Sequence, residues 1–151
     1  MALKNILCAG SVLASIAVGP AQEPAILWLL NIYYHSDSSP AVAITSAGAM
    51  KWQSRTDNIV DASPAIAADG QVYFAARQGD FAGMTPAGER KWFLWIGGPV
   101  VSSPAISPKG DIYILSHHGV AEAIQGTAGL AQTSWPMYRG NLRHAGRVER
   151  H

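Results

Sequence analysis

One stretch of the chain is present in two copies, and this duplication restricts the possible folds more than any other feature. The copies occupy residues 63–79 and 103–119, and each opens with Ser-Pro-Ala-Ile. Residues in matching places are 40 positions apart: Ser63 and Ser103, Gly70 and Gly110, Tyr73 and Tyr113, Gly79 and Gly119. A fixed period of about 20–50 residues is typical of solenoids, propellers and other repeat arrays. The fold is therefore expected to be built from tandem units of one design.

Each repeat is predicted to consist of strands and tight turns. The segments 72–75 and 112–115 are runs of β-branched and aromatic residues, which favour strands. Asp69-Gly70 precedes the first run, and such a pair is a strong signal for a hairpin turn. One repeat then holds four short strands, at 63–67, 71–76, 81–85 and 90–96. Because these strands are apolar on both faces, we expect a sheet that is covered on both sides.

Four-stranded antiparallel sheets that pack against one another in this way are the blades of a β-propeller. The register extends backward, since Pro24 precedes Pro64 by the same 40 positions that separate Pro64 from Pro104. The first unit is degraded, because Leu30-Asn31 stands where the later repeats have a turn with glycine. We predict an all-β fold in which residues 22–134 form about three antiparallel four-stranded blades of an incomplete β-propeller, starting near residues 24, 64 and 104.

The motifs resemble those of a known family. The order Gly-x-x-x-Trp, Ser-Pro-Ala-Ile and Asp-Gly-x-Val-Tyr-Phe is similar to the PQQ-like, or quinoprotein-type, β-propeller repeat. Gly48 with Trp52, and Gly88 with Trp92, resemble the tryptophan-docking motif of that family. The resemblance implies that each tryptophan packs between adjacent blades and that each glycine permits the close approach. The segment 134–147 resembles a terminal segment of secreted bacterial members.

The resemblance also raises the question of a cofactor. Quinone-dependent dehydrogenases of this family bind PQQ and calcium at the axis of a complete ring, through a Glu, an Asn, a catalytic Asp and often two adjacent cysteines. This chain has a single cysteine, Cys8, and no matching acidic motif. We therefore expect no cofactor and no catalytic, cofactor-binding or metal-binding residues. The alternative is a remnant or subunit of a PQQ-dependent oxidoreductase whose cofactor site is missing here.

Two groups of side chains were considered as metal ligands. His117 and His118 are adjacent, so on a strand they point to opposite faces and do not share a metal ion. Zinc sites need three or four convergent ligands. Asp57-Asn58 with Asp61 suggests calcium only weakly, because the spaced oxygen ligands and the glycine of a calcium loop are absent. Both groups are expected to have structural roles.

The remaining reactive side chains are also expected to be structural. Ser63 and Ser103 do not lie in a Gly-x-Ser-x-Gly nucleophile motif, and their repetition favours a structural role. Asp69 is expected to be a turn residue rather than a catalytic acid. The formal net charge is +1, which gives no general attraction to nucleic acid. We expect a non-enzymatic scaffold that binds a protein or glycan partner, or associates with itself to complete a ring.

Residues 1–21 are predicted to be a signal peptide. A positive charge and an apolar run at 6–18 are followed by small residues, which suits cleavage with a mature start at Gln22. The run is too short for a helical membrane span, which needs about 20 apolar residues. We therefore predict a secreted or periplasmic protein of the bacterial envelope. The alternative is a degraded part of an upstream blade, with a strand at 15–18.

Residues 135–151 are predicted to be a C-terminal tail. The tail is rich in arginine, and a solvated terminus is expected rather than a site for an anionic partner. Closed propellers have about four to eight blades, so three repeats are too few for a ring. Three arrangements remain open: the C-terminal part of a longer propeller, two chains that together make six blades, or an arc whose ends are covered by its own termini. A β-barrel or sandwich binding module is a further alternative that the matched repeats disfavour.

Overall fold

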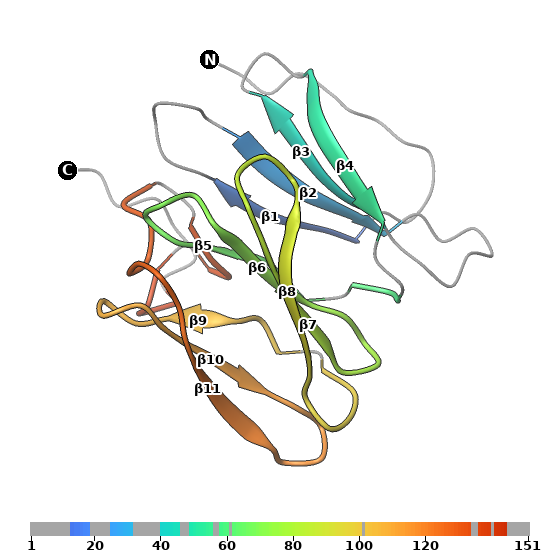
Figure 1. Ribbon diagram of the computed structural model, residues 1–151, viewed down its shortest axis with the longest axis vertical. Coiled ribbons are helices and arrows are strands. Elements are labelled where there is room, and N and C mark those ends of the chain that lie inside the picture. Colours follow the sequence, from blue (N-terminus) through green and yellow to red (C-terminus); the bar gives the residue numbers. More distant parts are fainter. Residues whose placement is uncertain are drawn as a thin grey trace.

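The computed structural model describes residues 13–18, 25–31, 40–45, 49–55, 58–60, 62–100, 102–133, 136–139 and 141–144, the first two segments by their backbone alone. These residues form eleven strands and no helix, so the predicted all-β class is confirmed. The strands are arranged in three antiparallel sheets that lie one after another (Figure 1). Since the described segments contain no helix, none of them offers a helical span for a membrane.

The sheets follow the order of the chain. The first has the order β1-β2-β3-β4, with strands β1 (Leu13–Val18), β2 (Ala25–Asn31), β3 (Pro40–Thr45) and β4 (Met50–Arg55). The middle sheet has the order β5-β6-β7-β8, with β5 (Ala65–Ile66), β6 (Val72–Ala75), β7 (Asp80–Met84) and β8 (Arg90–Trp95). The third sheet has β9 (Ala105–Ile106), β10 (Asp111–Leu115) and β11 (Ala121–Gln125), with β10 in the centre.

The middle sheet confirms the strand predictions. Strands β5 to β8 lie within or overlap the four predicted ranges, and each strand pairs with the next. The turn at Asp69-Gly70 connects β5 and β6, and Gly70 has φ +81°, in the region that favours glycine. Gly88 has φ +87° in the turn between β7 and β8. The glycines of the repeat therefore lie where a tight turn requires them.

The first sheet differs from the prediction. This unit was expected to start near Pro24 and to follow the later repeats in a degraded form, with Leu30-Asn31 at the position of their turn. Instead, Ala25–Asn31 forms one uninterrupted strand, β2, which pairs with both β1 and β3. The cause is the missing glycine turn, because nothing in the run Ala-Ile-Leu-Trp-Leu-Leu-Asn reverses the chain. Residues 32–34, which lie 40 positions before residues 72–74 of the repeat, are outside the described residues.

β1, which lies at one edge of the first sheet, is within the predicted signal peptide. β1 (Leu13–Val18) pairs with β2 along its whole length, so the alternative interpretation, which placed a strand at 15–18, describes the backbone of this segment. Whether residues 1–21 are removed remains a prediction. The outer strands β3 and β4 keep the repeat, because they lie about 40 positions before β7 and β8.

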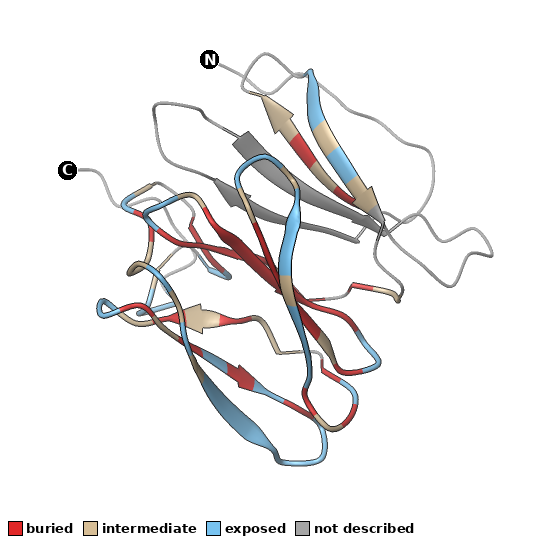
Figure 2. Cartoon of the chain, viewed as in Figure 1, coloured by how far each residue is buried: buried red, intermediate tan, exposed pale blue. Residues whose placement is uncertain are grey.

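Strands β5 to β7 of the middle sheet are buried on both faces, as the apolar pattern predicts, whereas the edge strand β8 is mostly exposed (Figure 2). One face packs against the first sheet and the other packs against the third. Its residues toward the first sheet are Ile66, Val72, Phe74, Ala82 and Met84. Its residues toward the third sheet are Ala65, Tyr73, Ala75 and Phe81. Successive strand residues thus alternate between two separate apolar cores.

The third sheet has three strands among the described residues, because the chain after β11 takes a different path. The backbone N–H of Ala131 donates to the carbonyl of Ile66, and the N–H of Ile66 donates to the carbonyl of Pro136, each over 2.9 Å. Leu130 also forms an isolated bridge with Ala67. This segment therefore supplies hydrogen-bond partners for the backbone groups at the free edge of β5, instead of pairing with β11 as a fourth strand of the third sheet.

The beginning of the C-terminal tail also differs from the expected solvated terminus. Met137 is 1% exposed and belongs to the core between the middle and third sheets. The reason is that the edge of β5 has backbone groups without ladder partners, and the tail supplies both hydrogen bonds and an apolar side chain. Tyr138 and Arg139 beyond it are exposed. Arg147 and Arg150 lie outside the described residues.

Candidate functional site

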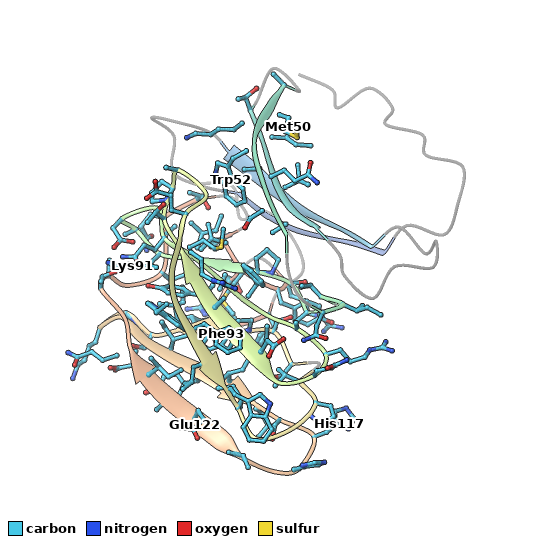
Figure 3. All side chains as sticks on the ribbon, turned by 45° about the vertical axis from the view of Figure 1, so that its right-hand side comes forward. Met50, Trp52, Lys91, Phe93, His117 and Glu122 are labelled. Carbon is cyan, nitrogen blue, oxygen red and sulfur yellow. The ribbon has the colours of Figure 1, made fainter. Side chains whose placement is uncertain are left out.

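Trp52 joins the first sheet to the middle sheet. It extends from β4 toward the turn between β7 and β8, and its Nε1–H donates to the carbonyl of Pro86 over 3.0 Å (Figure 3). A Cβ atom on Gly88 would lie 2.5 Å from the indole, so the ring rests directly on this glycine. The docking motif predicted that Trp52 packs between adjacent units. Gly48, with which the motif pairs it, lies outside the described residues, and the glycine that its ring contacts is Gly88 of the next repeat.

Trp92 lies at the junction of the middle and third sheets. Its ring stacks on Tyr73 with centroids 5.8 Å apart, and it meets the edge of Phe81 at 5.4 Å. The ring covers Gly83, where a Cβ atom would lie 2.5 Å away. It also packs with the core that contains Ala128, at the turn of the third sheet that matches the turn of Gly88. Both predicted docking tryptophans therefore lie between sheets.

A small polar cluster links the same two sheets at their turns. Asp69 accepts hydrogen bonds from the side chains of Gln71 and Thr127 and from the backbone N–H of Gln71. Partial burial raises the pKa of Asp69, but the hydrogen bonds from Thr127 and Gln71 outweigh it, so the pKa lies below its ordinary value of 3.8. Asp69 is thus an ionised turn residue that holds Thr127 of the third sheet, as its expected structural role requires.

The two histidines occupy a turn rather than a strand. His117 and His118 lie between β10 and β11, and both are exposed. The Nδ1 atom of His118 lies 3.2 Å from the carbonyl oxygen of Gly97, and its ring covers Gly98. His118 thus contacts the loop that connects the middle and third sheets. Within the described part of the chain, no three His, Cys, Asp or Glu side chains converge as metal ligands would.

The repeated serines contact each other. The backbone N–H of Ser63 donates to Oγ of Ser103 over 3.0 Å, so matching positions of successive repeats lie side by side. Asn58, which was considered for calcium, donates to the carboxylate of Asp80. Asp57 and Asp61 lie outside the described residues. The side chains of Asp69, Ser103 and Asn58 therefore bind other parts of the protein.

The outward face of the third sheet is the most distinctive surface. Tyr113 and Leu115 are 49% and 51% exposed, whereas Tyr73, at the matching position of the middle sheet, is 1% exposed. Ala123 and Ala121 lie directly opposite them on β11 and are exposed as well. We call these four residues the open face. A position that the repeat buries in the middle sheet is therefore exposed in the third sheet.

The sequence analysis did not single out the open face. The available signal was the match of Tyr73 with Tyr113, which lies in the last repeat that the pattern identifies. An apolar residue that packs between sheets in one repeat is left uncovered in the last repeat, unless something else covers it.

A second apolar surface follows the outer edge strand of the middle sheet. Phe93, Leu94 and Trp95 on β8 are exposed (Figure 2). The guanidinium carbon of Arg90 lies 6.0 Å from the ring centroid of Phe93, and Nε1–H of Trp95 donates to the carbonyl of Gln78 over 3.3 Å. This strip is therefore an edge of the sheet with exposed aromatic side chains.

Comparison with known proteins gives no family: no family model and no curated protein matches the chain. The resemblance to PQQ-like repeats accordingly rests on the sequence motifs alone.

Proposed function

We propose that the chain is a non-enzymatic repeat protein of the PQQ-like β-propeller type, part of a larger propeller or of a ring assembled from several chains. It acts as a scaffold that binds a protein or a glycan, outside the cell or in the bacterial envelope. The observation that carries this proposal is the contrast between buried Tyr73 and exposed Tyr113 at one position of the repeat. The exposed copy gives the scaffold an apolar surface that matches a surface buried elsewhere in the chain.

The use of the polar side chains supports a scaffold rather than an enzyme. Asp69, Ser103 and His118 each lie within hydrogen-bonding distance of a group in another repeat or in the connecting loop. A catalytic group needs a free position at which it meets substrate. These three side chains instead hold the sheets together, which is the role that a binding scaffold requires of them.

The proposed binding surface can be tested inside the cell of origin. A photo-crosslinking phenylalanine analogue at position 113 should form an adduct with a macromolecule, because this side chain is then buried against a partner. The same analogue at Leu142, which is exposed on the tail, serves as the control and should react much less. Equal yields at both positions would contradict a specific surface.

The oxidoreductase alternative has a direct test. Purified protein is incubated with PQQ and calcium, and quinone absorbance and dye-linked alcohol oxidation are then measured. The scaffold proposal predicts neither stoichiometric quinone uptake nor turnover. Quinone-dependent turnover above that of a heat-treated sample would overturn it.

The proposed location depends on cleavage before Gln22, which would remove β1 and leave a first sheet of β2 to β4. The N-terminal sequence of protein recovered from the periplasm or the medium decides this point. A mature start at Gln22 supports export through a signal peptide. An intact protein that begins at Met1 and remains in the cytoplasm would contradict it and make β1 part of the working fold.

A further inference from the structure

The repeat gives each sheet two faces of different character. The face toward the preceding sheet has Met84 in the middle sheet and Ile124 at the matching position of the third. The face toward the following sheet has Tyr73 in the middle sheet and Tyr113 at the matching position. We call the face with the Met84 position the first kind and the face with the Tyr73 position the second kind. At each contact between two sheets, the later sheet contributes its face of the first kind and the earlier sheet contributes its face of the second kind.

One end of the molecule presents the second kind of face. On the third sheet, Ile112 and Ile114 are buried against the middle sheet. Tyr113 and Leu115 alternate with them and point away, so nothing in the described chain covers them. This open face is apolar at its centre, since Ala123 and Ala121 lie opposite these residues.

The other end presents the first kind of face. On β3, Ala41 and Ala43 are buried against the middle sheet. Val42 and Ile44 alternate with them and are half-buried, at the positions that match Ala82 and Met84. In the middle sheet those two positions pack on the first sheet. Val42 and Ile44 therefore belong to a face that the repeat uses to cover its neighbour, and they lie on β3, which remains whether or not residues 1–21 are removed.

We propose that a second copy of this chain covers the open face, with its first sheet packed on the third sheet of the partner. A second contact of the same kind, in which the two copies exchange roles, closes a ring of two copies and six sheets. Six sheets lie within the range of about four to eight blades of closed propellers. The two junctions of this ring are related by a two-fold axis, and each of them joins two different faces.

The choice of a second copy rests on the faces that the chain itself carries. Each junction among the described sheets joins the two kinds of face, and one face of each kind remains at the two ends of the stack of described sheets. A symmetric contact between two open faces would place Tyr113 against Tyr113, a pairing that neither internal junction uses. This inference rests on the proposed scaffold function and names its partner.

The experiment uses a pair of opposite charges. Leu115→Glu puts a carboxylate on the open face, and Val42→Lys puts an ammonium group on the face of the first sheet. In either variant alone, both junctions of the ring bury a charge against an apolar surface, which we expect to raise the dissociation constant by about tenfold or more. In an equimolar mixture, one junction joins the introduced carboxylate to the introduced ammonium group and the other is wild type. We therefore expect the mixture to recover association.

Sedimentation velocity over a dilution series gives the readout. We expect twice the mass of the chain for the wild type, a single chain for each variant, and twice the mass for the mixture. Leu142→Glu is the matched control, because this leucine is 46% exposed and lies off the open face, and it should leave association unchanged. Recovery in the mixture also shows that both variants are folded.

Three results would overturn the inference: a wild-type protein that stays monomeric up to high concentration, open polymers in place of a finite particle, or variants that the mixture does not rescue. Association abolished by Leu115→Glu but unaffected by Val42→Lys would assign a symmetric contact instead. A monomer that shows no quinone turnover and still crosslinks through position 113 would reject the second copy and leave the scaffold function standing.

Discussion

Gly88 and Gly119 have similar backbone angles, with φ of +87° and +78°, but their surroundings differ. A Cβ atom on Gly88 would meet the ring of Trp52 at 2.5 Å, whereas a Cβ atom on Gly119 would meet nothing within 4 Å. Substitution by alanine therefore imposes the same backbone strain at both sites and a steric clash at only one.

We predict that Gly88→Ala lowers the free energy of unfolding by about 1–3 kcal/mol more than Gly119→Ala, because overpacking adds to the backbone cost. Denaturant unfolding of both variants measures the difference. Removing the ring in Trp52→Ala should abolish most of the extra loss, since the clash then has no partner. Equal losses at the two glycines would mean that Trp52 does not rest on Gly88.

Asp69 gives the fold a pH dependence whose direction can be derived. Its pKa in the folded state is lower than the ordinary value of 3.8, so the ionised form stabilises the fold. That contribution is fully present above about pH 4 and is lost as the pH falls through the lowered value, because the unfolded chain takes up the proton first. We predict that the melting temperature of the wild type falls more steeply between about pH 4 and pH 2 than that of Asp69→Asn. Parallel curves for the two proteins would contradict a stabilising role of the Asp69 carboxylate at the junction of the middle and third sheets.

At the residue scale, the sequence predicted the docking of Trp52 but not the exposure of Tyr113. The first comes from a motif of glycine and tryptophan that each repeat carries, and the ring of Trp52 contacts the glycine of the next repeat. The second depends on whether another sheet packs on the third repeat. Burial of Tyr73 comes from the next sheet and not from its own strand, so the matching local pattern at Tyr113 does not indicate its exposure.

At the scale of elements, the prediction succeeded where turns mark the strand ends. β6 and β10 are preceded by Gly70 and Gly110, and both strands lie where the pattern placed them. The inner strands of the first sheet were wrong because no such turn is present, and an apolar run without a turn does not specify where it reverses. The tail was also misjudged, since its burial depends on the free edge of β5, which is distant in sequence.

The docked tail should be part of the cooperative fold. Met137 is 1% exposed and Met50 is 63% exposed, so the two methionines make a matched pair. We predict that Met137→Ala lowers the free energy of unfolding by about 2–5 kcal/mol, as expected for a buried methionine. Met50→Ala should change it by less than about 0.5 kcal/mol. Denaturant unfolding compares them, and a small loss at Met137 would mean that the tail is not docked on the core.

At the scale of the whole molecule, the middle sheet is the only one of the three whose two faces are both covered within the described chain. The third sheet buries Ile112 and Ile114 against it and leaves Tyr113 and Leu115 exposed. The first sheet buries Ala41 and Ala43 against it, and the alternating Val42 and Ile44 are half-buried. The described sheets therefore carry apolar side chains at both ends of the stack.

The central claim is that repeats of 40 residues stack in register, with matching residues of adjacent sheets side by side. Ser63 and Ser103 test it directly, because their backbone and side chain are joined by a hydrogen bond of 3.0 Å. In a Cys8→Ser background, Ser63→Cys with Ser103→Cys should form an intramolecular disulfide under mild oxidation, since the two sites are close enough to be bridged.

Ser63→Cys with Ser107→Cys serves as the control, because Ser107 bonds to Asp111 within its own turn. Thiol counting should show no free thiol in the first protein and two in the second. Two free thiols in the first protein, or disulfides formed equally in both, would contradict stacking in register.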